Sequence, residues 1–251
     1  MEQVLAALEE QHGELESLLG GLGADGWHSP SPCEGWDVAD VVTHLSQTDE
    51  MALASAEGRF AEFLDVLASG VEGVGGVDEG ADALVVKERG RPDAEVFERW
   101  RSGAAALRSA LAAADPHSRV QWVVGTLSVH TLTATRLAEC WIHSGDVADA
   151  LGVERTPTDR LEHIARLAWR TLPYAFAKAG RELSGPVAFD LVAPSRARWE
   201  FQPDGEPATV ISGEGVELCS VAGRRLTPDQ TSLVASGPDA DAVLELVRTY
   251  A

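Results

Sequence analysis

The amino-acid sequence predicts an α+β protein in which a bundle of four to five helices is followed by a small α+β domain. Apolar residues recur at three- and four-residue spacings through most of the first 183 residues, which is the period of an amphipathic helix. After Pro186, apolar and polar residues alternate in short runs, as they do in half-buried strands. We therefore expect a helical domain over residues 1–183 and an α+β domain over residues 184–251.

The first two helices have clear start and stop signals. Residues 2–22 carry leucines and valines at helical spacing, and the sequence GGLGADGW then breaks the pattern. A second helix is expected to begin at Val38, because Asp37 suits the N-cap position and Asp40 the third helical position. Its apolar pattern continues toward Leu67 with few helix-breaking residues. This helix is therefore either long or made of two pieces.

Three further helices complete the helical domain. They are expected over residues 94–114, 129–151 and 159–179, and Gly152 supplies a stop for the second of them. The glycine-rich residues 70–80 separate the first of these helices from the preceding apolar run. Their composition predicts a flexible link.

The C-terminal domain is expected to contain four strands and two helices. The alternating runs predict strands over residues 187–193, 196–202, 207–212 and 232–237. Helical spacing predicts helices over residues 215–223 and 239–251.

Charge and cysteine content exclude several classes of function. The net charge of −20 disfavours binding to nucleic acid and to anionic membranes. The N-terminus carries acids where a signal peptide needs bases, and no apolar run approaches the ~18 residues of a membrane span, so we expect a cytoplasmic protein. The cysteines Cys33, Cys140 and Cys219 form no CxxC motif. Any metal is therefore expected to be held mainly by histidine and carboxylate side chains.

A candidate metal site emerges from two of the predicted helices. Glu139 and His143 are four residues apart, so both project from one face of the expected helix 129–151. His44 lies among apolar residues of the helix that begins at Val38. An up-and-down bundle can bring these two faces together, so that three donors converge.

This donor set suits a catalytic metal. Two histidines and one glutamate give Zn²⁺, or a similar divalent ion, three ligands and leave a fourth position open for water or substrate. Asp40 lies one turn before His44, and Arg136 and Asp146 each lie three residues from a candidate ligand. These three residues stand where groups that support the bound cofactor are expected, and Asp146 is placed to orient His143.

Simpler explanations compete with each of these roles. A Glu-x-x-x-His pair on a helix is most often a solvated hydrogen bond, and a lone histidine on an apolar face is most often a satisfied core residue. Asp40 is also explained as an acid favoured at a helix N-terminus, Asp146 as a solvated charge and Cys140 as a small buried hydrophobe. Three other histidines are expected at the surface: His12, His117 and His163.

Two stretches of the sequence resemble a known family. PSPCEGWDVADVVTHL is similar to the N-terminal signature of the mycothiol-dependent maleylpyruvate isomerase family of the DinB-like superfamily, in which a Pro-Cys-x-Gly-Trp-x-Val loop leads into a helix bearing a His-Leu pair. RLAECWIHSGDVADALG is similar to the second signature of the family, Glu-x-x-x-His-x-x-Asp. The resemblance extends over nearly the whole chain and implies a DinB-like helical bundle. Carried over, the metal ligands of the family fall on His44, Glu139 and His143.

The resemblance also implies a cosubstrate. In the family, the metal is thought to hold the sulfur of a small thiol, and an arginine of the C-terminal domain assists with the substrate. The candidates for that catalytic arginine are Arg224 and Arg225 in the sequence AGRRLTPDQ, although two exposed arginines on a turn would look the same.

We therefore expect a metal-dependent enzyme whose cofactor is Zn²⁺ or another divalent ion and whose cosubstrate is mycothiol or a similar small thiol. The activated thiolate would add to a small electrophilic substrate, giving either transfer or isomerisation. One alternative is metal-dependent hydrolysis, for which the sequence offers no convincing general base. Another is a non-catalytic metal- or ligand-binding protein of the same fold.

Overall fold

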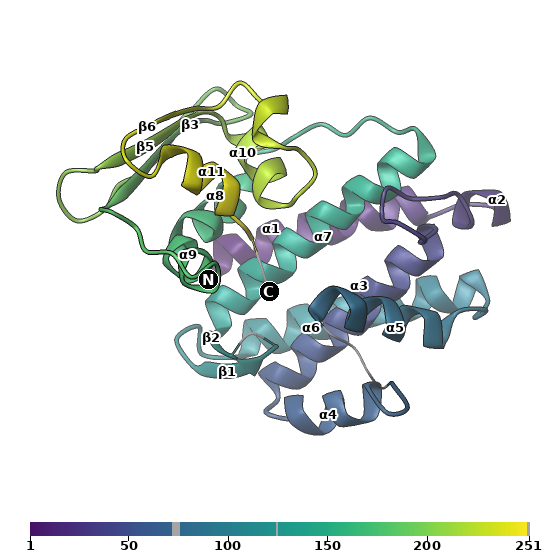
Figure 1. Cartoon of the computed structure of the whole chain (residues 1–251). Helices are drawn as coiled ribbons and strands as arrows, with labels where there is room; N and C mark the ends of the chain where they lie inside the picture. The colour runs from purple at the N-terminus through teal and green to yellow at the C-terminus, as the bar shows by residue number, and fades with distance from the viewer. Residues whose placement is uncertain (72–75, 124, 250–251) are drawn as a thin grey trace. The chain divides into compact units, whose positions relative to one another are not determined.

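The computed structural model describes residues 1–71, 76–123 and 125–249 and divides into two compact units (Figure 1). The first unit is Met1–Arg155 and the second is Thr156–Ala251. The first is mainly helical and the second combines helices with a sheet, which confirms the predicted α+β class.

The first unit contains helices and one short hairpin. Its elements in chain order are α1 (Glu2–Leu19), α2 (Ala24–Trp27), α3 (Val38–Ala56), α4 (Phe60–Leu67), α5 (Val77–Glu88), α6 (Asp93–Ala113), β1 (Arg119–Trp122), β2 (Gly125–Ser128) and α7 (Val129–Leu151). β1 and β2 pair in antiparallel fashion directly before α7. 

Helices α1, α3, α6 and α7 form the bundle (Figure 1). Helix α3 packs against both α6 and α7, and α1 packs against the same two partners. Val38, Val41, Val42 and Leu45 form the apolar stripe of α3 and are fully buried. Burying each such side chain stabilises the fold by roughly 1.5–3 kcal/mol, which fixes the rotation of α3 about its axis and so the direction of His44.

The second unit is built on a four-stranded sheet. Its elements are α8 (Leu161–Arg170), α9 (Leu172–Lys178), β3 (Val187–Val192), β4 (Arg198–Phe201), β5 (Thr209–Glu214), α10 (Gly215–Ala222), the 3-10 turn η1 (Pro228–Gln230), β6 (Val234–Ser236) and α11 (Ala240–Leu246). The strand order is β4-β3-β5-β6. β3 and β5 are parallel, and the two outer strands run antiparallel to their neighbours.

The boundary between the units differs from the one expected from sequence. The sequence pattern placed it at residue 183, whereas the contacts divide the chain at residue 155. The reason is that α8 packs against β3, β4 and α10 of the sheet unit, and α9 packs against α11. The helical period of a segment does not specify which element the resulting helix packs against.

Two of the expected helices are each divided in two. The apolar run after Val38 is made of two pieces, which was one of the two alternatives expected, and it breaks between α3 and α4, where Gly58 has a φ of 75°. The expected helix 159–179 becomes α8 and α9, and Pro173 stands in the first turn of α9. Proline lacks the N–H that would continue the hydrogen-bond ladder of α8.

The expectation of a flexible link over residues 70–80 is wrong for its last four residues. Residues 72–75 lie outside the described residues, but residues 77–80 belong to α5. The final helix was expected to reach residue 251, whereas α11 ends at Leu246, and residues 250–251 are not described.

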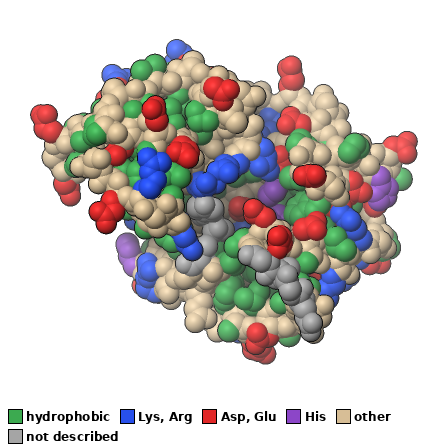
Figure 2. Space-filling view, viewed as in Figure 1, with side chains coloured by type: hydrophobic (Ala, Val, Ile, Leu, Met, Phe, Trp, Pro, Cys, Tyr) green, Lys and Arg blue, Asp and Glu red, His purple; other side chains and the backbone are tan. Residues whose placement is uncertain are grey.

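Acidic side chains are spread over the face viewed in Figure 2, in keeping with the net charge of −20. None of the helices in the described part of the chain combines the length and apolar character needed to cross a bilayer. The cytoplasmic location stays a prediction.

Candidate metal centre

Helices α3 and α7 bring the three predicted ligands together. Glu139 Oε2 lies 3.6 Å from His44 Nε2 and 3.7 Å from His143 Nε2. The two imidazole rings are 4.9 Å apart between centroids and meet edge to face. All three side chains are largely buried but retain some exposure, 12% for each histidine and 21% for the glutamate. The cluster can therefore be reached from solvent.

The start of α3 is fixed by a capping box. Asp37 accepts a hydrogen bond from the backbone N–H of Asp40 at 2.9 Å, and the Asp40 carboxylate accepts one from the N–H of Asp37. Arg89, just after α5, donates to both oxygens of Asp40 at 2.8–3.1 Å. Asp40 therefore positions the helix that carries His44, and its helix-capping explanation is the one that these contacts favour.

His143 is oriented by Asp146, as the spacing on α7 suggested. Asp146 Oδ2 lies 2.8 Å from His143 Nδ1, and because a carboxylate oxygen only accepts, Nδ1 carries the proton. Nε2 then faces Glu139. A second donor reaches the same carboxylate oxygen, since Cys33 Sγ lies 3.2 Å from Asp146 Oδ2. The loop before α3 is thereby tied to α7.

Arg136 is connected to the cluster through α3. It is 1% exposed and donates to Asp49 Oδ1 at 2.9 Å and to Thr48 Oγ1 at 2.8 Å. Thr48 in turn donates to the carbonyl oxygen of His44 at 2.9 Å. Arg136 thus holds the turn of α3 that follows His44.

The three ligands differ in their protonation. Burial alone would raise the pKa of Glu139, but the neighbouring His44 and the positive charges of His143 and Arg136 lower it to about 2. Burial lowers the pKa of His44. Burial acts in the same direction on His143, but its hydrogen bond to Asp146 and its proximity to Cys33 and Glu139 raise that pKa to about 9. The cluster therefore pairs an ionised carboxylate with one neutral and one protonated imidazole at neutral pH.

The donor atoms fit a divalent ion such as zinc. Bonds of ~2.0–2.1 Å in tetrahedral geometry place neighbouring ligand atoms roughly 3.3 Å apart. The observed separations of 3.6 and 3.7 Å are close to this value and longer than ordinary hydrogen bonds. The donor atoms of all three residues lie within 4.8 Å of one another. Two imidazoles and a carboxylate are also the donor types that zinc accepts in catalytic sites.

Other predicted residues lie elsewhere in the chain. Arg224 and Arg225 belong to the second unit, are exposed and follow α10 in a turn. Arg225 donates to the carbonyl oxygen of Gly223 at 3.1 Å, and Arg224 has a φ of 62°. Their catalytic role stays a prediction.

Two neighbours of the cluster were not singled out from sequence. Cys33 Sγ, His143 Nδ1 and Asp146 form a second group of potential ligand atoms. The Trp36 ring packs 5.2 Å from the His44 ring, and its Nε1 donates to Asp82 of α5. Both residues belong to the loop just before α3 and are the Cys and Trp of the Pro-Cys-x-Gly-Trp-x-Val signature, which was the available signal.

Comparison with known proteins assigns the family. The family model described as the mycothiol maleylpyruvate isomerase N-terminal domain matches residues 8–148. Two curated proteins from strains of Mycobacterium tuberculosis, named uncharacterized proteins MT0041 and Rv0036c, are each 32% identical over 250 residues. Those matches cover 98% of this chain and 95% of each relative. The chain belongs to the mycothiol maleylpyruvate isomerase family.

Solved structures show the same fold. The crystal structure of a mycothiol-dependent maleylpyruvate isomerase superposes with a TM-score of 0.61 at 19% identity, covering 94% of this chain and 92% of that chain. A point mutant of the mycothiol-dependent maleylpyruvate isomerase gives a TM-score of 0.60 with the same identity and coverage. At 19% identity, this similarity shows only that the chain shares the fold of these structures.

Proposed function

We propose that this protein is a divalent-metal-dependent enzyme that activates a low-molecular-weight thiol, such as mycothiol, for reaction with a small electrophilic substrate. The observation that carries the proposal is the convergence of His44, Glu139 and His143 from α3 and α7. Membership of the mycothiol maleylpyruvate isomerase family supports a thiol as the cosubstrate.

The ligands would be Nε2 of His44, Nε2 of His143 and a carboxylate oxygen of Glu139, with zinc as the expected ion. Three protein ligands leave one position for a small molecule. When bound, the ion supplies positive charge that lowers the pKa of a thiol and stabilises its anion at neutral pH.

The side chains around the three ligands orient them, influence their ionisation and cover one side of the cluster. Asp146 keeps a proton on His143 Nδ1, so Nε2 is the atom that would bind a metal, after release of the proton that it carries at neutral pH. Arg136 helps to keep Glu139 ionised, because its positive charge lowers the pKa of that carboxyl. Trp36 covers one side of the His44 ring and so limits the approach of water there.

The expected reaction is addition of a thiolate to an electron-poor carbon of a double bond. A C–S bond forms as the π bond breaks, and the electron pair moves onto the acceptor group of the substrate. If the neighbouring carbon is then protonated, the result is transfer. If rotation and loss of the thiol follow instead, the double bond re-forms with the opposite geometry and the result is isomerisation. We propose that Arg224 or Arg225 binds an anionic group of the substrate.

Cobalt substitution tests the proposal directly. The Co²⁺-loaded protein should develop a thiolate-to-metal charge-transfer absorption when mycothiol is added, and S-methylated mycothiol should produce none. His143→Ala should abolish the absorption, whereas Asp149→Ala, which removes an exposed carboxylate of the same helix, should preserve it. Absence of the band in the metal-loaded wild type would overturn the thiol function. Thiol-independent hydrolysis of substrate would then favour the hydrolase, and metal binding without turnover would favour the binding protein.

A further inference from the structure

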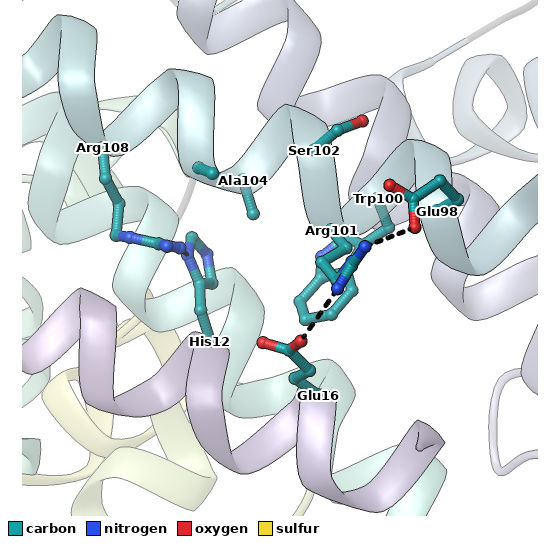
Figure 3. A pocket seen from close by; sticks show the side chains of 9 residues that line it. His12, Glu16, Glu98, Trp100, Arg101, Ser102, Ala104 and Arg108 are labelled. Atoms are coloured by element: carbon teal, nitrogen blue, oxygen red, sulfur yellow. Dashed lines mark hydrogen bonds and ion pairs between the residues drawn. The ribbon is translucent and has the colours of Figure 1, made fainter. Parts of the chain in front are cut away.

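A pocket lies in the first unit, between α1 and α6 (Figure 3). Its volume is about 350 Å³, at the lower end of the ~300–1,000 Å³ typical of small-molecule sites. His12 and Glu16 contribute from α1, and the remaining lining comes from α6. None of the three candidate metal ligands lines it.

The two ends of this pocket differ in charge. At one end Arg101 donates to Glu98 at 2.7 Å and lies 3.9 Å from Glu16, so its positive charge is compensated (Figure 3). At the other end Arg108 points at His12, and its Nη1 lies 2.7 Å from His12 Nδ1. No carboxylate pairs with Arg108 among the residues that the structure describes. This end of the pocket therefore carries one positive charge without a carboxylate partner, whereas the other end carries two carboxylates, Glu16 and Glu98, for one guanidinium.

The contact between Arg108 and His12 also fixes the state of the histidine. A guanidinium only donates, so His12 Nδ1 must accept and the ring proton must lie on Nε2. His12 Nε2 is 3.9 Å from Asp49 Oδ2, which is beyond hydrogen-bonding distance. The His12 ring is therefore neutral and contributes no positive charge to this end of the pocket.

Two buried N–H groups of the lining have no hydrogen-bond partner in the described structure, His12 Nε2 and Trp100 Nε1. Their side chains are 3% and 1% exposed. His12 Nε2 faces the Asp49 carboxylate at 3.9 Å, so of the two donors it is Trp100 Nε1 whose dipole favours negative charge near the pocket. Ala104 and Ala105 add apolar surface beside them.

We propose that the pocket between α1 and α6 is a binding site for a small monocarboxylate with an apolar body, anchored by the guanidinium of Arg108. One unpaired guanidinium matches one carboxylate in charge and can bind it through two parallel N–H groups. The alanines and the edge of Trp100 contact the body of the ligand. A dianion such as phosphate finds a single compensating charge and is expected to bind more weakly.

Calorimetric titration with benzoate tests the site, using the full chain both zinc-loaded and chelator-treated. Wild-type protein should bind benzoate saturably in both states, and Arg108→Gln should weaken binding by about tenfold or more. Arg101→Gln is the matched comparison: it removes the same charge from the pocket but leaves Glu16 and Glu98 without their cation, so it should weaken binding by repulsion, and by less than Arg108→Gln, which removes the anchor itself. Thermal unfolding followed by circular dichroism verifies that both variants fold, and Arg108→Lys, which keeps the charge, should bind better than Arg108→Gln.

Several results would overturn the proposal. One is the absence of saturable benzoate binding to the wild type. Another is an affinity for benzoate that is the same in Arg108→Gln as in the wild type. Benzylamine has the same ring with the opposite charge, and equally tight Arg108-independent binding of this probe would show that the pocket does not select a carboxylate. Binding of inorganic phosphate without binding of benzoate would exclude the monocarboxylate assignment.

Discussion

Buried His12 should make the stability of the protein depend on pH. Its pKa is lowered from 6.5 to about 4, chiefly by burial, with Arg108 and Arg136 acting in the same direction and Asp49 against them. Between these two values the unfolded chain binds more protons than the folded one. The contribution of His12 to the free energy of unfolding is therefore complete above pH 6.5 and decreases as the pH falls toward 4.

The size of this effect follows from the two pKa values. One pKa unit corresponds to about 1.4 kcal/mol, and for a group that titrates at 6.5 unfolded and about 4 folded, the loss between pH 7 and pH 5 is about 2 kcal/mol. Other titrating groups contribute their own pH dependence. The contribution of His12 is isolated by comparison with His12→Gln, because glutamine does not titrate and its amide oxygen can still accept from Arg108.

Urea unfolding at pH 7, 6 and 5, followed by far-ultraviolet circular dichroism, measures this difference. Wild type should lose about 2 kcal/mol more than His12→Gln over this range. His117→Gln, which changes an exposed histidine, should behave like the wild type. Equal pH dependence in wild type and His12→Gln would refute the reasoning.

Three further predictions concern the metal centre and the second unit. Asp146→Asn should weaken zinc binding by about 10–100-fold, because His143 loses the carboxylate that orients it, and competition with a chelating dye measures this; unchanged affinity would contradict the role of Asp146. Cys33→Ala should weaken zinc binding more than Cys33→Ser in the same assay, since serine retains a donor for Asp146, and equal values would show that this donor does not matter. Arg225→Ala should reduce kcat/KM for an anionic substrate about tenfold or more with metal content unchanged; normal kinetics in both Arg224→Ala and Arg225→Ala would remove these arginines from the mechanism.

The arrangement of the candidate metal ligands was largely predictable because these residues obey local rules. Glu139 and His143 are one turn apart on a helix whose bounds, Val129–Leu151, were expected from the apolar period and Gly152. Asp37 and Asp40 signalled where α3 begins. Local rules do not supply the pairing of α3 with α7, which was expected from the packing of an up-and-down bundle and then from the family resemblance.

Other features escaped prediction for physical reasons. Helix α5 buries only Val85 among its own residues and contains Gly80, so its apolar period is weak. It is held through long-range contacts, of which the hydrogen bond from Trp36 to Asp82 is one.

The expectation that His12 lies at the surface was wrong. Glutamates and glutamine precede it in the chain, but it lies four residues after Leu8 and three before Leu15, both fully buried. The helical period therefore places His12 on the buried face of α1. Helical spacing would have located this residue better than the polarity of its sequence neighbours.

The most direct test of the central claim is elemental analysis of protein purified without chelator or affinity metal. We expect close to one divalent metal ion per chain in the wild type and in Asp149→Ala, and loss of that ion in Glu139→Ala. A wild type that holds no metal even after incubation with zinc, or a Glu139→Ala variant that keeps full occupancy, would contradict this expectation.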